Sequence, residues 1–200
     1  MCLPRRARGV SLIEIVIVLV ILGLLAIAVG PEISQQLRNL QVRNAAEAMQ
    51  AGLQKARTEA ISRNANVRFT LVSDLKSSCT ASPSGGSWIV SLDDPTGKCN
   101  QLASATAAPR IIAVHSSGDG GAMAGIAATR PDLTSAESTI VFNSFGRPMD
   151  TSQLARIVVS SSVSPADYRS YRLDVSPIGS VRMCDPKVST SSDDPRRCPT

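Results

Sequence analysis

The residues of this 200-residue chain that could carry out acid–base or nucleophilic chemistry are not spaced for catalysis. The single histidine, His115, stands among serines near Asp119, but a Ser-His-Asp triad requires three groups assembled around an activated nucleophile. No G-x-S-x-G elbow is present, and the glycine-rich run at 118–125 lacks the lysine and spacing of a phosphate-binding loop. Asp93, Asp94 and Asp119 are too few ligands for calcium. We therefore expect no enzyme, no metal site and no cofactor.

The cysteines could bind metal or form disulfides. Cys2 lies in a basic N-terminal segment, which leaves Cys79, Cys99, Cys184 and Cys198. No Cys-x-x-Cys spacing occurs and histidine is scarce, so a zinc site is disfavoured. Disulfides are the better interpretation, and they require an oxidising compartment such as a periplasm. Pairing of neighbours along the sequence would close two short loops worth about 3 kcal/mol each, but the sequence does not choose among the three possible pairings.

The net charge of +5 overstates how basic the folded part is. Of the 21 basic residues, three (Arg5, Arg6 and Arg8) lie in the N-terminal segment, which leaves 18 against 16 acidic residues. A nearly balanced domain gives little electrostatic support for strong non-specific binding of nucleic acid.

An apolar run extends from Val10 to Gly30, interrupted only by Ser11 and Glu14. At 1.5 Å per helical residue this run spans about 30 Å, the thickness of one hydrocarbon core. Three arginines precede the run and none follows before Arg38. The positive-inside rule therefore leaves the N-terminus in the cytoplasm and sends the C-terminal domain outward.

Glu14 separates a filament-forming helix from two simpler interpretations. An ordinary signal peptide, cut near Ala28, would have a shorter apolar stretch. A plain signal anchor has no use for a carboxylate that costs about 2.5–3.5 kcal/mol when unpaired near the bilayer centre. A helix that leaves the lipid to join other helices could pair Glu14 with the N-terminal amine of a neighbouring subunit. That amine exists only if the chain is cut just before Val10.

The residues Gly9-Val10-Ser11-Leu12-Ile13-Glu14 resemble the class III signal of type IV prepilins. In that family a membrane-embedded prepilin peptidase cuts after the glycine and methylates the new N-terminus. The resemblance therefore implies cleavage at Gly9, N-methylation of Val10 and registration of subunits by Glu14. Glycine suits a cleavage point because a backbone without a side chain fits a tight protease cleft. Val10 departs from the usual Phe or Met, but an aliphatic first residue is compatible with the pattern.

The helix is predicted to continue beyond the apolar run, as one helix from about Val10 to Ser62. Pro31 would kink this helix by removing a hydrogen bond, as a proline does at the corresponding place in pilins of that family, or it would start a second helix at its first turn. Apolar residues recur mainly at steps of three, four and seven, which predicts one buried stripe. Its members are Ile33, Leu37, Leu40, Met49, Leu53, Ala56 and Ala60.

After Asn64 short β-branched segments alternate with clusters of Ser, Gly, Pro and Asp, which is typical of strands and turns. Segments 74–86 and 115–137, rich in Gly, Ser and Ala, are predicted to be mobile or partner-facing loops. The predicted fold class is α+β, a pilin fold in which a long N-terminal helix, membrane-embedded in its first half, packs on antiparallel β-sheets. The predicted strands are 67–73, 87–92, 109–114, 138–143, 155–161, 171–175 and 180–184, with turns at 142–148 and 176–180.

The layout of residues 10–184 resembles the FimT, FimU and GspH group of minor pilins and pseudopilins. The resemblance rests on LQKARTEAISRNANVRF at 53–69, the lone Trp88, TIVFNSFGRP at 139–148 and a hairpin ending in VRMC at 181–184. In that group the segment at 56–61 is the buried end of the helix, which implies burial of Ala56, Ala60 and Ile61. The implied organisation is a cleaved leader at 1–9, a transmembrane and filament-core helix at 10–30, an amphipathic helix at 31–63, a β-rich domain at 64–184 and an irregular, disulfide-tethered tail at 185–200.

Some FimT-like pilins bind DNA through a Gly-Arg-x-Arg motif in a C-terminal loop. The matching residues here are Gly179, Ser180, Val181 and Arg182. Ser180 replaces the first arginine, so one phosphate contact is missing and only Gly179 and Arg182 carry over. Because phosphate contacts dominate such affinity, DNA binding is a minor alternative, and Arg182 is otherwise a solvated strand residue.

The resemblance implies a structural protein: a minor pilin of a type IV pilus, in the tip or priming complex that initiates assembly. The alternatives are an H-type minor pseudopilin of a type II secretion system and a DNA-binding minor pilin for natural transformation. Two cysteine pairs and the VRMCDP ending favour the pilus. The implied partners are prepilin peptidase, other minor and major pilins or pseudopilins and the inner membrane. The implied location is a single pass through the inner membrane with a periplasmic domain, and later the filament.

Overall fold

The computed structural model describes residues 11–164, 166, 168–191 and 193–199, without the side chains of 26–32. The predicted leader, Cys2, Gly9 and Val10 therefore lie outside the described residues. The chain forms two compact units, Met1–Leu37 and Arg38–Thr200.

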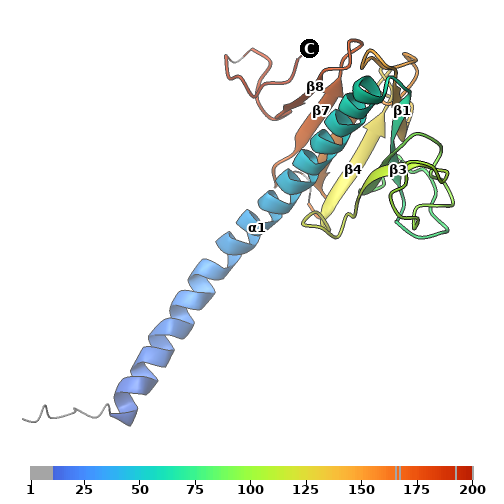
Figure 1. Ribbon diagram of the computed structural model, residues 1–200. Helices are drawn as coiled ribbons and strands as arrows, with labels where there is room; N and C mark the ends of the chain where they lie inside the picture. The colour runs from blue at the N-terminus through green and yellow to red at the C-terminus, as the bar shows by residue number, and fades with distance from the viewer. Residues whose placement is uncertain (1–10, 165, 167, 192, 200) are drawn as a thin grey trace, which may run out of the picture. The chain divides into compact units, whose positions relative to one another are not determined.

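Within the described residues, one helix, α1 (Leu12–Arg63), provides all of the α-structure, as the sequence predicts (Figure 1). Its first turn begins on the carbonyl oxygen of Ser11, which accepts hydrogen bonds from the N–H groups of Glu14 and Ile15 at 3.1 and 3.3 Å. The backbone stays helical through position 31, so no second helix starts there. The side chain of Pro31 is outside the described residues, and the kink stays a prediction.

In the second unit α1 buries one stripe against the sheets, as expected from spacings of three and four residues. The predicted burial is wrong at Leu40, a member of the predicted stripe, and at Ile61, which the family resemblance placed in the buried end of the helix. Leu40 and Ile61 are 52% and 49% exposed, because at 100° per residue they are rotated away from their buried neighbours Val42 and Ala60. Ile33 and Leu37, in the first unit, are also exposed. The buried members are Val42, Ala45, Ala46, Met49, Leu53, Ala56 and Ala60.

The first sheet has the strand order β3-β2-β1-β5, with every pair antiparallel. Phe69 in the central strand lies opposite Val90 on one side and Ile140 on the other. The strands are β1 (Val67–Val72), β2 (Ser87–Ser91), β3 (Ile111–His115) and β5 (Thr139–Phe142).

The second sheet has the order β4-β6-β7-β8 and is also antiparallel. Its edge strand β4 (Ala124–Thr129) corrects the prediction of a loop throughout 115–137. Small residues gave this segment little β-propensity, but six residues pair with β6, and Ile126 and Ala128 are buried. The other strands are β6 (Arg156–Ser161), β7 (Tyr171–Val175) and β8 (Val181–Cys184).

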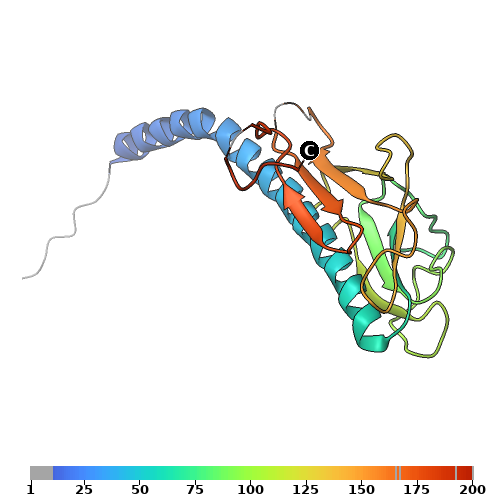
Figure 2. The same cartoon turned by 90° about the horizontal axis from the view of Figure 1, so that it is seen from above.

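The main core lies where α1 meets both sheets, and β7 and β8 run beside the second half of the helix in two views (Figures 1 and 2). Gly52 lies where α1 packs against the rings of β1 and β2. A Cβ atom at this position would lie 2.7 Å from the ring of Phe69 and 2.8 Å from that of Trp88. The glycine therefore makes room for the two aromatic rings, whose centroids are 5.6 Å apart.

A smaller core covers the other face of the first sheet. The disulfide Cys79–Cys99 packs there with Val72, Ile89 and Ile111. This cluster explains why all five residues of β2 are buried: alternate side chains face α1 on one side and the disulfide on the other.

Candidate functional site

The described start of α1 exposes an almost wholly apolar surface. Between Leu12 and Leu25 every large apolar side chain is about half exposed or more, up to 82% at Leu12. Such a surface in a single chain requires cover from lipid or from other helices. The predicted span at 10–30 also includes Val10 and the side chains of 26–30, which are not described.

Among the described residues, no helical stretch is both long and apolar enough to count as a membrane crossing.

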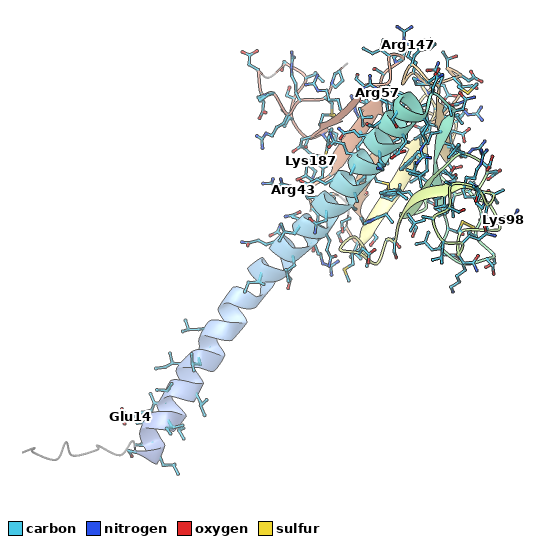
Figure 3. The ribbon with its side chains drawn as sticks, viewed as in Figure 1. Glu14, Arg43, Arg57, Lys98, Arg147 and Lys187 are labelled. Atoms are coloured by element: carbon cyan, nitrogen blue, oxygen red, sulfur yellow. A yellow bond between two sulfur atoms is a disulfide. The ribbon has the colours of Figure 1, made fainter. Side chains whose placement is uncertain are left out.

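Glu14 is the one charged residue of this surface, and it lies in the first turn of α1 (Figure 3). Ser11 and Glu14 have the spacing of a capping box, and a carboxylate in the first turn interacts favourably with the helix dipole. Glu14 is exposed, so its carboxylate is accessible to a partner. Capping is enough to explain a carboxylate in the first turn of α1. It does not by itself require that carboxylate to pair with a neighbouring helix.

The tail after β8 is tied down at several points. The disulfide Cys184–Cys198 connects it to the strand, and the N–H of Asp185 donates to the carbonyl of Arg196 at 2.8 Å. The guanidinium of Arg172 donates to the carbonyl of Pro199 at 2.6 Å. These bonds hold the irregular tail in place beside β7 and β8. The two disulfides are those between sequence neighbours.

Arg182 also holds this tail. Its guanidinium donates to the carbonyl oxygens of Pro195 and Arg197 at 3.3 and 3.5 Å. These contacts give Arg182 a structural partner that the sequence did not reveal. A role of Arg182 in binding DNA stays a prediction. The guanidinium would then have to contact a phosphate as well as the carbonyl oxygens of the tail.

The backbone conformation and the packing of Gly179 explain why a glycine occupies this position. Its φ of +80° is in the left-handed region, and a Cβ atom there would lie 1.8 Å from the carbonyl oxygen of Gly146. Ser180 closes the same turn, with its hydroxyl 2.7 Å from that of Ser176. The packing of two loops thus requires a glycine at this position, whether or not the chain binds DNA.

Three loops at one end of the domain expose apolar side chains. Phe145 is 80% and Ile178 is 63% exposed, and Met149 and Leu133 are also exposed. The same loops surround an apolar groove of about 220 Å³, lined by Pro131, Pro148 and Pro177 among others. Large exposed apolar patches usually mark contacts with other proteins. We call this region the apolar loop surface.

His115, considered above for catalysis, and Asp93 and Asp94, considered for calcium, all have structural partners. His115 stacks on Trp88 at 5.4 Å between ring centroids. The Nε of Arg110 donates to Asp93 at 2.8 Å, which lowers the pKa of that carboxyl, and hydrogen bonds from Thr96 lower the pKa of Asp94. Within the described part of the chain, no three His, Cys, Asp or Glu residues are grouped so that they could hold a metal ion.

Comparison with known families gives two matches. The family model for the type II transport protein GspH matches residues 45–179, and the model for the prokaryotic N-terminal methylation motif matches residues 4–30. The chain belongs to the GspH family. This family comprises pilin-like structural subunits, minor pilins and pseudopilins, and its members are not enzymes. No curated protein sequence matches the chain.

Two crystal structures of the type IV minor pilin FimU from Pseudomonas aeruginosa strain PAO1 are similar to this GspH-family chain. One has 17% sequence identity and a TM-score of 0.49, and covers 70% of this chain and 90% of FimU. The other has 16% identity and a TM-score of 0.46, with 71% and 87% coverage.

The expected family and fold class are confirmed, since the chain has a long N-terminal helix packed on two antiparallel sheets. The methylation motif covers Gly9, Val10 and Glu14 and implies processing by a prepilin peptidase and anchoring in the inner membrane before assembly with other pilins. On sequence alone, a type IV pilus is favoured, partly because of the cysteine pattern. The matched family instead favours the alternative, a type II secretion system.

Proposed function

We propose that this chain is an H-type minor pseudopilin of a type II secretion system. The observation that carries the proposal is the match to the type II transport protein GspH over residues 45–179, joined to the methylation motif at 4–30. A minor pilin of a type IV pilus is the alternative, because the physics of the helix is the same in both filaments.

Maturation would begin in the inner membrane. Prepilin peptidase would cut after Gly9 and methylate Val10, and the helix at 10–30 would hold the subunit until assembly. The exposed apolar side chains from Leu12 onward support this step, since they can exchange lipid for neighbouring helices. Glu14 would pair with the amine of a neighbour's Val10 and set the register, because a charge buried among helices needs a partner.

The domain at 38–200 would then lie in the periplasm. Its two disulfides fit an oxidising compartment. The apolar loop surface, with Phe145 and Ile178 exposed, offers a contact for other minor subunits. The role proposed is mechanical: the subunit contributes surfaces to the filament and performs no chemistry.

Deletion of the gene in its native host tests the proposal. We expect secreted enzymes to accumulate in the periplasm while piliation and twitching stay normal, and the wild-type gene to restore secretion. The pilus alternative requires the reverse, with loss of piliation and normal secretion. Loss of natural transformation alone would favour the DNA-binding alternative. A deletion that leaves secretion intact overturns the assignment to type II secretion.

A further inference from the structure

A cavity of about 360 Å³ opens between α1, the second sheet and the tail. Arg43 comes from α1, Arg169 from the segment before β7, and Arg196 from the tail, so three guanidiniums arrive from three separate elements. The cavity volume is near the lower end of the range for ligand pockets, roughly 300–1,000 Å³. Arg43, Arg169 and Arg196 are far apart in the sequence and share no common motif.

The floor of the cavity is largely apolar. Tyr171 of β7, Met183 and the disulfide-bonded Cys184 of β8, and Pro195 of the tail line it. The pKa of Arg43 is raised first by its hydrogen bond to Glu47, and that of Arg196 first by Asp194. Tyr171 lines the cavity together with Arg43 and Arg196.

The arginines keep donors available for a ligand. Arg43 bonds Glu47 through Nε at 2.7 Å, and Arg196 bonds Asp194, but a guanidinium has five N–H donors. In the described part of the chain, no hydrogen bond or ion pair involves the guanidinium of Arg169, whose backbone N–H donates to Asn39 at 2.9 Å. Among the described residues, Asp185 is the one carboxylate that lines the cavity.

The walls are held in place before any ligand arrives. The disulfide Cys184–Cys198 fixes the tail. Lys187 ties the tail to the segment that carries Arg169, because its Nζ donates to the carbonyl oxygens of Ala166 and Tyr168, both at 2.7 Å. Figure 3 shows Arg43 and Lys187 on the face that carries the tail, whereas Arg147 lies at the end of the domain where α1 stops. Binding to a preformed site costs less free energy, because its side chains and loops are already ordered.

We propose that this cavity binds a carboxylate-bearing peptide segment of a partner protein. Guanidiniums pair with carboxylates through two parallel hydrogen bonds, and the floor of Tyr171, Met183 and Pro195 accommodates apolar side chains next to the acid. Nucleic acid is a poorer fit, because Glu47, Asp185 and Asp194 lie among the arginines and would repel a continuous phosphate backbone more than a single carboxylate. The inference does not depend on which secretion or pilus system the subunit serves.

Binding of a fluorescent hexapeptide of alternating glutamate and leucine tests the proposal. The full chain in non-ionic detergent would be titrated at low salt, with fluorescence anisotropy as the signal and the glutamine–leucine hexapeptide as the control probe. We expect saturable binding of the glutamate peptide only. Arg169→Gln should weaken it by about tenfold or more, the value of a lost charge-assisted hydrogen bond.

Arg147→Gln is the matched control, because it removes the same charge from an exposed arginine outside the cavity. We expect less than about a twofold change, because Arg147 does not line the cavity and makes no direct contact with a ligand there. Equal weakening by both substitutions, equal binding of both peptides, or no binding of the glutamate peptide overturns the proposal. So does binding of a short single-stranded oligonucleotide that depends on Arg169 when the glutamate peptide does not bind.

Discussion

Arg57 of α1 donates its Nε–H to the carbonyl oxygen of Gly146 at 3.1 Å, which connects the helix to the loop after β5 across 89 residues of sequence. Gly179, in the loop between β7 and β8, packs on the same carbonyl and lies close to the same guanidinium. Both sheets are therefore joined to the end of α1 at one point. The loops that form the apolar loop surface take their positions from this junction.

Gly179→Ala should destabilise the domain by about 3 kcal/mol or more. The left-handed φ costs a side chain roughly 1–2 kcal/mol, and the clash with the Gly146 carbonyl adds the cost of overpacking, roughly 1–3 kcal/mol. Gly97→Ala is the control, because its φ is +74° and nothing lies within 4 Å of its Cβ position. That variant should lose only about 1–2 kcal/mol. Urea unfolding of both proteins measures the difference, and equal losses would remove the role assigned to the carbonyl.

Gly52→Ala should destabilise the contact between α1 and the first sheet. The new methyl group would press on Phe69 and Trp88, at a cost of roughly 1–3 kcal/mol, against a gain in helix propensity of about 1 kcal/mol. We expect a lower melting temperature and a changed tryptophan emission. Gly23→Ala has open space around its Cβ and lies outside the unit Arg38–Thr200, so it should neither lower the melting temperature of that unit nor change the tryptophan emission. A Gly52→Ala domain more stable than wild type would show that the rings can move aside.

Removing Cys79–Cys99 should cost more global stability than removing Cys184–Cys198. The first disulfide lies in the small core on the first sheet, so a double alanine variant loses buried packing as well as the loop constraint, which is worth about 3 kcal/mol. Removing the second should mainly release the tail, which limited proteolysis would detect as cleavage after 185. Equal shifts of the urea midpoint in the two variants would contradict this ranking.

Glu14→Gln should leave processing intact and block assembly. The substitution keeps the size and the capping position but removes the charge, so the subunit should be cut and anchored yet be absent from filaments. Mass spectrometry of the membrane form is expected to show a methylated chain starting at Val10. Gly9→Ala supplies the contrast, because it should leave the uncut precursor. Filaments that incorporate Glu14→Gln at the wild-type level would argue against registration by this carboxylate.

Stability should fall on the acid side below about pH 4.5. The pKa of Glu59 is lowered from 4.5, chiefly by its hydrogen bond with Lys55, that of Asp93 from 3.8 by Arg110, and that of Asp194 to about 2 by Arg196. A carboxyl with a lower pKa in the folded state stabilises above its unfolded pKa, and this contribution is lost as the pH falls through the folded pKa.

Urea midpoints measured from pH 7 to pH 2 check this expectation, and they should be nearly constant down to about pH 5. Arg110→Gln removes the main cause of the lowered pKa of Asp93. The urea midpoint of this variant should therefore fall less between pH 5 and pH 2 than that of the wild type. An unchanged midpoint at pH 3 would mean that these partly exposed ion pairs contribute nothing to stability.

Most of the elements could be predicted from the sequence because their signals are local. α1, β1 to β3 and β5 to β8 lie where periodicity and β-branched residues place them. β4 could not be found, because Ala124 to Thr129 become a strand only by pairing with β6, about 30 residues away. Burial was wrongly predicted at Leu40 and Ile61 because α1 carries apolar residues on more than one side, and spacing alone does not show which side faces the sheets.

The sites differ in the same way. The cleavage motif around Gly9 and Glu14 is contiguous in sequence and was recognised directly. The cavity joins Arg43, Arg169 and Arg196, which only the antiparallel pairing of β7 with β8 and the course of the tail bring together. The left-handed φ of Gly179 and its packing on Gly146 depend on two loops meeting, so its sequence context pointed to DNA instead.

The only indole of the chain sits at the contact between helix and sheet, with Trp88 pressed between Gly52, Phe69 and His115. The intrinsic fluorescence of the unlabelled protein therefore reports on one place alone. A shift of its emission to longer wavelength would show α1 lifting from the first sheet during export, detergent exchange or polymerisation, without any dye having to be attached.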